Sequence, residues 1–205
     1  MTTKIETTEQ IFSYGIGLQM GDQLSGDEFS DIEVDALVEG IKTAIAKGEH
    51  AVSRDQLAAA FGEMQQRIEA KQAEKHAGKI EEGAAFLAEN AAKDGVITLD
   101  SGVQYEIITE GTGEKPTAES TVRTHYHGTL TDGTVFDSSY DRGQPAEFPV
   151  GGVIAGWTEA LQLMPVGSKW KLTIPANLAY GERGAGGAIG PHETLQFDIE
   201  LLDIV

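Results

Sequence analysis

The chain has 205 residues, of which 40% are hydrophobic and 7% aromatic, enough for one large domain or two small ones with a buried core. It contains no cysteine, which excludes disulfides, thiol catalysis and thiolate metal sites. The formal net charge is −18, shared equally by the parts before and after Gly95, so neither part offers a basic face for nucleic acid.

The N-terminal region is acidic rather than basic. Residues 10–21 are uncharged and fairly apolar, but Glu6 and Glu9 precede them and no convincing cleavage site follows, which argues against a secretory signal peptide. No run of apolar residues approaches the length of a membrane span. The sequence therefore predicts a cytoplasmic protein with neither membrane nor nucleic acid as a partner.

The first half of the chain carries three helix-start signals of the form Ser/Thr-x-x-Glu/Gln. They are Thr7-x-x-Gln10, Ser30-x-x-Glu33 and Ser53-x-x-Gln56, each followed by apolar residues at helical intervals. Gly48 is expected to end the second helix. Because no proline precedes Pro116, the third helix is predicted from Arg54 to Asp94, about 60 Å long, with Gly95 as its terminator.

The predicted long helix has no apolar stripe over residues 70–79, so its middle is expected to be exposed on all sides, as a bendable stalk. The first two helices offer too little apolar surface to form a domain alone and would be better buried against a second copy of themselves. Gly17-x-x-x-Gly21 would permit two helices to approach closely. The patterns favour a homodimer through the N-terminal helices, with a monomeric helical hairpin as the alternative.

After Gly95 the pattern changes to β-branched and aromatic residues with partial alternation, which is typical of strands. The predicted strands cover residues 103–109, 121–130, 168–174 and 194–204. Residues 131–134 form a predicted hairpin turn, and residues 157–164 a short helix with Trp157, Ala160 and Leu161 on one face. The expected fold class is α+β: an all-α N-terminal region, a long connecting helix, and an antiparallel sheet wrapped around a short helix.

Between Asp132 and Gly184 the chain repeatedly places aromatic and bulky apolar residues beside glycine. This stretch contains no plausible nucleophile–base pair, no metal cluster and no phosphate-binding loop. One carboxylate, that of Asp137, stands among the apolar residues, which are Tyr126, Phe136, Phe148, Val153, Ile154, Trp157, Tyr180 and Phe197. Taken one at a time, most of them are ordinary core residues. As a set they suit an apolar pocket with few polar contacts.

The order and spacing of these residues, from about Thr121 to Val205, closely resemble the FKBP-type peptidyl-prolyl isomerases, the macrolide-binding immunophilins. The resemblance implies a catalytic set and a substrate-binding set. The catalytic set is Tyr126, Phe136, Asp137, Trp157, Tyr180 and Phe197, with Trp157 as the pocket floor. The substrate-binding set is Arg142, Phe148, Val153, Ile154 and Ile189, where Arg142 would keep Asp137 ionised and the backbone amide of Ile154 would make a polar contact.

The whole chain resembles the Mip-like bacterial subgroup of that family, in which an N-terminal helical region dimerises. This implies a dimerisation domain at residues 1–52, a connecting helix at 53–95 and an isomerase domain at 96–205. The implied partners are proline-containing polypeptides, a second copy of the chain and a macrolide inhibitor. Two departures concern the rim of the pocket: Ala146 replaces an aromatic residue, and the glycine-rich loop 185–190 is expected to be looser than usual.

The implied reaction is rotation about an X–Pro bond, whose barrier is about 18–20 kcal/mol. A twisted amide is less dipolar than a planar one, so a dry aromatic pocket favours it over the ground state without a nucleophile. The leading hypothesis is therefore a dimeric prolyl isomerase that acts on unfolded or partly folded chains. The alternatives are a chaperone module that binds proline segments with little turnover, and a purely structural coiled-coil dimer, which leaves the second half unexplained.

Two histidines, His125 and His127, are separated by one residue on a predicted strand, so their side chains lie on the same face. Two ligands without a third do not make a metal site, and exposed strand residues are the simpler interpretation. The sequence predicts no metal and no cofactor.

Overall fold

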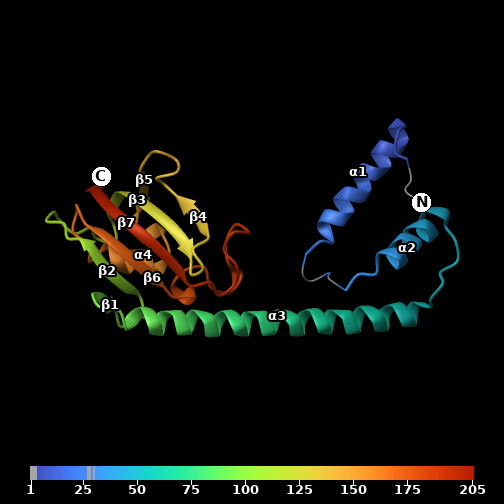
Figure 1. Ribbon diagram of the computed structural model, residues 1–205, viewed down its shortest axis with the longest axis horizontal. Coiled ribbons are helices and arrows are strands. Elements are labelled where there is room, and N and C mark those ends of the chain that lie inside the picture. Colours follow the sequence, from blue (N-terminus) through green and yellow to red (C-terminus); the bar gives the residue numbers. More distant parts are fainter. Residues whose placement is uncertain (1–3, 27–28, 30) are drawn as a thin grey trace. The chain divides into compact units, whose positions relative to one another are not determined.

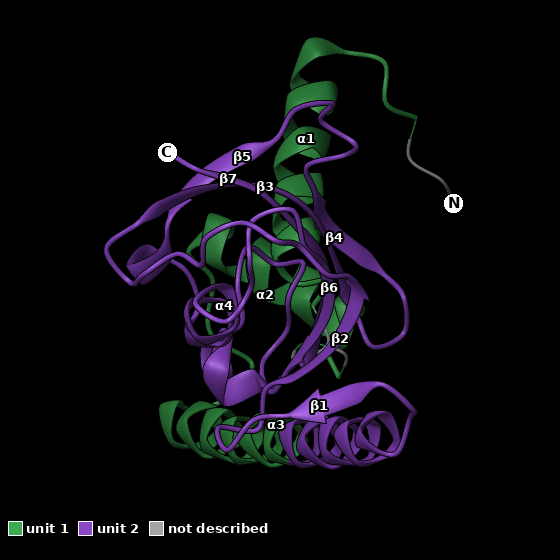
Figure 2. Cartoon of the chain, turned by 90° about the vertical axis from the view of Figure 1, so that its left-hand side faces the viewer, with its two compact units in different colours: residues 1–73 green, residues 74–205 purple. Residues whose placement is uncertain are grey.

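The computed structural model describes residues 4–26, 29 and 31–205. The chain separates into two compact units, residues 1–73 and residues 74–205, coloured separately in Figure 2. The division falls inside the long helix, so the second half of that helix belongs with the sheet. The functional division expected from sequence, at residues 52 and 95, stays a prediction.

The first unit contains α1 (Thr8–Gln23) and α2 (Val34–Ala46), shown in blue in Figure 1. The capping box at the start of α1 is confirmed: the Gln10 amide donates to the Thr7 side chain, and the Gln10 side chain accepts from the Thr7 amide. Ser30 lies outside the described residues. Glu33 occupies the N-cap position of α2 without a side-chain cap hydrogen bond. The helix ends on Lys47 in a left-handed conformation, one residue before the predicted Gly48.

The apolar side chains of α1 lie on two opposite faces of the helix. At 3.6 residues per turn, Ile11, Tyr14 and Leu18 fall on one face, whereas Phe12, Ile16 and Met20 fall on the other. All six are exposed, and neither α1 nor α2 contains a buried residue. Cβ atoms added at the predicted contact glycines 17 and 21 would meet open space. The first unit therefore leaves apolar surface uncovered on both sides of α1.

The long helix α3 (Arg54–Ala91) has 38 residues and spans about 57 Å at 1.5 Å per residue. Its predicted capping box is confirmed, because the Gln56 amide donates to Ser53 Oγ over 3.2 Å and the Ser53 amide to Gln56 Oε1 over 2.9 Å. The helix ends three residues before the predicted Asp94, and Gly95 follows with a φ of 85°. No helix in the described part of the chain is long and apolar enough to cross a membrane.

The second unit is built on an antiparallel sheet, as expected. Its strands are β1 (Val96–Thr98), β2 (Gln104–Thr109), β3 (Thr121–Leu130), β4 (Val135–Ser138), β5 (Ala146–Pro149), β6 (Lys169–Ile174) and β7 (Leu195–Ile204). The order is β1-β2-β6-β7-β3-β4, with β5 paired to β3. The short strands β1 and β5 were not predicted, whereas β4 is the second strand that the predicted hairpin turn implies. The predicted turn at residues 131–134 joins β3 to β4.

One face of the sheet wraps around α4 (Ala155–Leu161). This helix begins two residues before the predicted start at residue 157 and ends three residues before the predicted end at residue 164. Trp157, Ala160 and Leu161 are all buried on its inner side, as predicted. Alternate residues of β7 point into the same core: Leu195, Phe197, Ile199 and Leu201. Short 3₁₀ helices, η2 (Val150–Gly152), η3 (Ala176–Leu178) and η4 (Gly181–Arg183), complete the connections around this core.

Within the second unit, the C-terminal half of α3 packs on the sheet through polar side chains. Asn90 is buried, and its amide nitrogen donates to Gln104 Oε1 over 2.8 Å and to Thr173 Oγ1 over 3.3 Å. Gln104 in turn donates to the backbone carbonyl of Leu87 over 2.8 Å. These hydrogen bonds tie the end of α3 to β2 and β6 and satisfy polar groups that would be costly to bury alone.

Candidate active site

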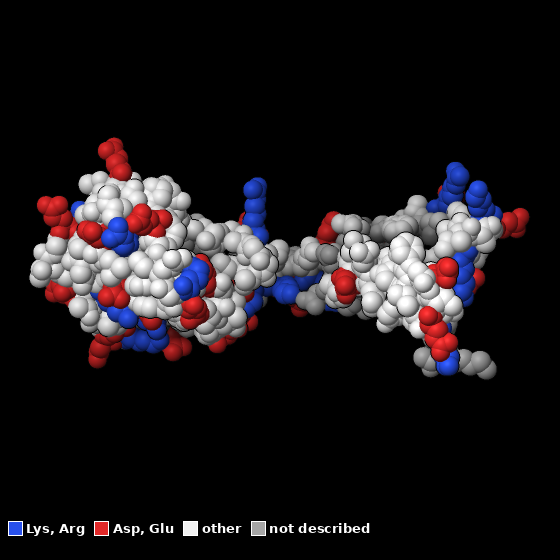
Figure 3. All heavy atoms as spheres, turned by 90° about the horizontal axis from the view of Figure 1, so that it is seen from above, with Lys and Arg blue, Asp and Glu red and all other residues white. Residues whose placement is uncertain are grey.

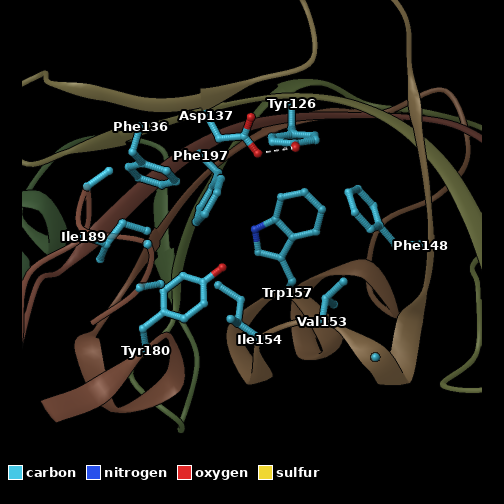
Figure 4. Close-up of a pocket in the computed structure, with 14 residues that line it drawn as sticks. Tyr126, Phe136, Asp137, Phe148, Val153, Ile154, Trp157, Tyr180, Ile189 and Phe197 are labelled. Atoms are coloured by element: carbon cyan, nitrogen blue, oxygen red, sulfur yellow. Dashed lines mark hydrogen bonds between the residues drawn. The ribbon is translucent and has the colours of Figure 1, made fainter. Parts of the chain in front are cut away.

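A cavity of about 670 Å³ opens between the concave side of the sheet, α4 and the loop that precedes β7 (Figure 4). A volume of this size is typical of small-molecule and peptide side-chain sites. The residues that line it are Tyr126, Phe136, Asp137, Phe148, Gly152, Val153, Ile154, Trp157, Tyr180, Ala185, Gly186, Ala188, Ile189 and Phe197.

Trp157 forms the floor of this cavity. It lies in the first turn of α4, is 4% exposed, and is surrounded by three rings in edge-to-face geometry. The ring centroids lie 5.4 Å from Tyr126, 5.7 Å from Phe148 and 5.2 Å from Phe197. Its Nε1 has no hydrogen-bond acceptor within the described residues. The rings fix the indole plane and leave its face toward the cavity, as Figure 4 shows.

A glycine on β3 makes room for the aromatic wall. Gly128 lies opposite Phe197 in the β3–β7 register, and Phe136 meets Phe197 edge-on at 5.4 Å. A Cβ atom on Gly128 would lie 2.6 Å from the Phe136 ring and 2.9 Å from the Phe197 ring. The two rings hold their present positions because residue 128 has no side chain.

The polar group of the site is a cluster of three side chains. Tyr126 donates from its hydroxyl to Asp137 Oδ2 over 2.5 Å, and Arg142 pairs with the other carboxylate oxygen of Asp137. Arg142 also donates to the Tyr126 hydroxyl over 2.6 Å and lies over the Tyr126 ring, 5.4 Å from its centroid. The pairing of Arg142 with Asp137 expected from sequence is confirmed.

This cluster decides the charge of Asp137. Burial by itself would raise the pKa of Asp137, but the hydrogen bonds from Tyr126 and Arg142 and the positive charge of Arg142 outweigh it, and the pKa lies below its ordinary value. Burial, followed by the hydrogen bond to Asp137, raises the pKa of Tyr126. At neutral pH the site therefore holds an ionised carboxylate beside a protonated phenol.

The backbone of Tyr126 is held from behind by Ser139, a fully buried residue that the sequence argument did not single out. The Tyr126 amide donates to Ser139 Oγ over 2.8 Å, and the Ser139 amide donates to the Tyr126 carbonyl over 2.9 Å. His125 Nδ1 lies 2.9 Å from the same hydroxyl, and its ring stacks on Tyr140. The only sequence signal was its position two residues after Asp137, and nothing in the sequence indicated that Ser139 is buried.

The rim of the cavity is formed by Tyr180 and the loop that follows it. Tyr180 is 41% exposed, and its hydroxyl points toward the space above Trp157 in Figure 4. The amides of Ala185 and Ile189 each donate to the other's carbonyl, over 2.8 and 3.0 Å, so residues 185–189 form a small hairpin. Positive φ angles at Gly186 and Gly187 close this turn, and the expectation that the loop is looser than usual for the family stays a prediction.

The structure brings ten of the eleven predicted site residues into the cavity wall and places Arg142 against Asp137. Their roles in catalysis stay predictions. Gly152, Ala185, Gly186 and Ala188 also line the cavity and were not predicted. Ala146 is half-buried on β5 and packs against the core. No group of three or more metal-ligating side chains occurs in the part of the chain that is described.

Two family descriptions account for most of the sequence. Residues 112–202 match "FKBP-type peptidyl-prolyl cis-trans isomerase", and residues 9–107 match "Domain amino terminal to FKBP-type peptidyl-prolyl isomerase". An Escherichia coli protein described as "FKBP-type 22 kDa peptidyl-prolyl cis-trans isomerase" is 50% identical over 204 residues, covering 100% of this chain and 99% of that one. The chain belongs to the FKBP-type peptidyl-prolyl cis-trans isomerase family.

Other members of the family extend the similarity. "Outer membrane protein MIP" of Legionella longbeachae is 43% identical over 206 residues, covering 98% of this chain and 88% of the relative. The crystal structure of FkpA from Escherichia coli superposes with a TM-score of 0.76 at 34% identity and covers 98% of both chains. The resemblance to Mip-like bacterial members and the expected α+β fold are confirmed, and the chain is an FKBP-type prolyl isomerase.

Proposed function

We propose that the cavity binds the proline ring of an X–Pro segment against Trp157 and accelerates rotation of the preceding amide by stabilising its twisted form. The observation that carries the proposal is the composition of the cavity: six aromatic side chains and three branched aliphatic ones around one ionised carboxylate. Tyr126, Phe136, Phe148, Trp157 and Phe197 line the cavity with apolar ring surface, which gives a bound amide few polar partners.

The physical argument is differential. Twisting an amide removes its resonance, so its carbonyl becomes less dipolar. A twisted amide therefore loses less hydration free energy than a planar amide when it leaves water. A dry site therefore stabilises the transition state relative to the ground state, which is the condition for catalysis. No proton is transferred and no covalent bond forms.

Two polar groups are placed to orient the substrate. Ile154 is the N-cap of α4, so its amide N–H lies before the first hydrogen-bonded amide of that helix. Within the described residues it has no backbone acceptor, which leaves it able to donate to a substrate carbonyl. The hydroxyl of Tyr180 lies across the cavity and can donate to a second carbonyl. These two donors would hold the chain on either side of the rotating bond.

Cis-to-trans conversion of a short prolyl peptide tests this proposal. Tyr180→Phe removes one hydroxyl and should lower kcat/KM by about tenfold, the effect of one lost hydrogen bond at the transition state. Tyr140→Phe is the matched control, because Tyr140 has nearly the same exposure and lies outside the cavity. Conversion at the buffer rate by the unmodified protein would contradict the proposal and favour a binding module without turnover.

We also propose that the chain acts as a homodimer through its N-terminal helices and serves as a foldase for long clients. Support comes from the exposed apolar faces of α1, which a second copy would cover. Two cavities in one particle would bind one unfolded chain twice and raise its effective affinity. Light scattering should give twice the chain mass of 21.9 kDa. Ile16→Glu should return the mass to that of one chain, whereas Gln72→Glu, on the exposed side of α3, should leave it doubled.

A cytoplasmic location and macrolide binding complete the proposal. Cell fractionation tests the location. The face seen in Figure 3 carries basic side chains interspersed with acidic ones, consistent with protein rather than nucleic-acid clients. A macrolide should compete with the peptide for the cavity, more weakly than in members with an aromatic residue in place of Ala146.

A further inference from the structure

The C-terminal half of α3 contacts the short segment between the cavity rim and β7, and it does so through side chains far from Trp157. His76 meets His192 edge-on with ring centroids 5.1 Å apart. Three residues further along the helix, Lys79 Nζ lies 3.4 Å from Glu193 Oε1, and that glutamate side chain is only 11% exposed. One turn later, Gly83 is buried against Thr194. Successive turns of α3 thus meet successive residues of the segment 192–194.

Gly83 shows how close this contact is. A Cβ atom on Gly83 would lie 2.7 Å from Thr194 Oγ1, which is far inside van der Waals contact. Gly78, on the same helix and in the same unit, would place its Cβ in open space. Glycine destabilises a helix by about 1 kcal/mol relative to alanine, so Gly83 lowers the stability of α3 itself. In return, the missing side chain allows Thr194 to approach the helix closely.

The segment 192–194 is joined directly to the rim. The His192 amide donates to the carbonyl of Gly181 over 2.8 Å, and Gly181 follows Tyr180 in the chain. His192 has a φ of 59°, a conformation that non-glycine residues adopt only when their surroundings hold it. On the other side, Ile189 lines the cavity three residues before His192. A shift of 192–194 therefore moves the supports of both rim residues.

We propose that His76, Lys79 and Gly83 are positioning residues for the isomerase: they set the position of Tyr180 and Ile189 over the cavity by bracing residues 192–194 against α3. The inference rests on the proposed role of the cavity. It gives the second half of the long helix a part in catalysis, and it assigns that part to residues outside the cavity wall. The functional catalytic unit then begins near Glu74 rather than after Gly95.

A double-mutant cycle in the full-length chain tests the proposal. For each variant three quantities are measured: kcat/KM for a short prolyl peptide, the thermal unfolding midpoint, and the NMR chemical shifts of the Tyr180 and Ile189 amides. Gly83→Ala should lower kcat/KM by about tenfold, because small displacements of orienting groups have large effects on rate. Gly78→Ala should keep the activity of the unmodified protein. Thr194→Ala removes the clashing hydroxyl, so the double variant Gly83→Ala/Thr194→Ala should recover to within about twofold of Thr194→Ala alone.

A merely structural role for Gly83 would lower the unfolding midpoint and the activity together, whereas a positioning role shifts the amides of Tyr180 and Ile189 and lowers activity in a folded protein. Lys79→Met and His76→Ala address the same segment without adding volume, and each should lower kcat/KM, with His76→Phe retaining the ring contact and the activity. Equal activities for Gly83→Ala and Gly78→Ala, or a loss that Thr194→Ala does not repair, would overturn the inference. Failure of the unmodified protein to convert the peptide would instead overturn the proposed function, and the NMR shifts would still report on the brace.

Discussion

The two units of this isomerase differ in how far they bury their apolar residues. In the second unit, Trp157, Leu172, Phe197 and Ile199 are buried in one core that the sheet and α4 share. In the first unit, α1 exposes its apolar residues on two opposite faces, and Phe61 on α3 is 74% exposed. The difference indicates that the sheet unit has a core of its own, whereas the helical unit leaves apolar surface that the proposed second copy would cover.

The largest effect is expected from separating the two units. A fragment of residues 74–205 should keep the kcat/KM of the full chain on a short prolyl peptide. On a long unfolded protein it should lose on the order of a hundredfold in effective affinity, because it can no longer bind at two cavities at once. Refolding rates at equal active-site concentration measure this. Equal refolding by the fragment and the full chain would break the comparison, since the helical unit would then add nothing.

The next effect concerns the aromatic wall. Gly128→Ala places a methyl group against the Phe136 and Phe197 rings and should destabilise the second unit by about 1–3 kcal/mol, the usual result of overpacking a core. Its peptide activity should fall as well, because the displaced rings narrow the cavity. Chemical denaturation and the peptide assay check both outcomes, with Gly62→Ala in α3 as control. Unchanged stability would show that the wall is less closely packed than the contacts indicate.

A pH dependence should follow from the polar cluster. Because the folded pKa of Asp137 lies below that of the unfolded chain, its ionised form favours folding above the ordinary aspartate pKa, and this contribution is lost as the pH falls through the folded pKa. Arg142→Met removes a hydrogen bond and a positive charge that lower the pKa of Asp137, so the acid limb of the activity profile should move to higher pH. An acid limb at the same pH in Arg142→Met would show that the ionisation of Asp137 does not control the pH dependence of activity.

The smallest effect separates helix propensity from packing. Gly62 and Gly78 lie on α3 with open space around them, one in each unit. Alanine at either position should raise helix stability by about 1 kcal/mol when the site is exposed. Only Gly78→Ala should then raise the unfolding midpoint of the 74–205 fragment, since Gly62 is absent from it. Thermal unfolding of the fragment and the full chain measures this. A lower unfolding midpoint for Gly78→Ala would contradict the open space around Gly78.

The features that sequence predicted well are those set by local chemistry or by an ordered motif. Two capping boxes could be identified because each involves four consecutive residues, and the cavity residues because Phe136-Asp137 and Trp157 stand in a recognisable order. The strands β1 and β5, which were missed, have three and four residues, too few for an alternating pattern to show.

What sequence did not predict depends on contacts between distant segments. The bonds of Asn90 to Gln104 and Thr173, and the approach of Gly83 to Thr194, join residues up to 111 positions apart, which no local pattern encodes. The hairpin at 185–189 was not predicted from the sequence either. Its glycines indicated freedom, but in the folded unit their positive φ angles close a turn.

The central claim is that the aromatic cavity of the second unit rotates an amide without moving a proton. The most direct test is kcat/KM for a short prolyl peptide, measured in ordinary and in heavy water at matched acidity. Equal rate constants in both solvents, well above the buffer rate, are the predicted result, because no bond to an exchangeable hydrogen changes in the transition state. A clearly slower reaction in heavy water would contradict the claim, since Tyr126, Asp137 or Tyr180 would then be acting as an acid or base.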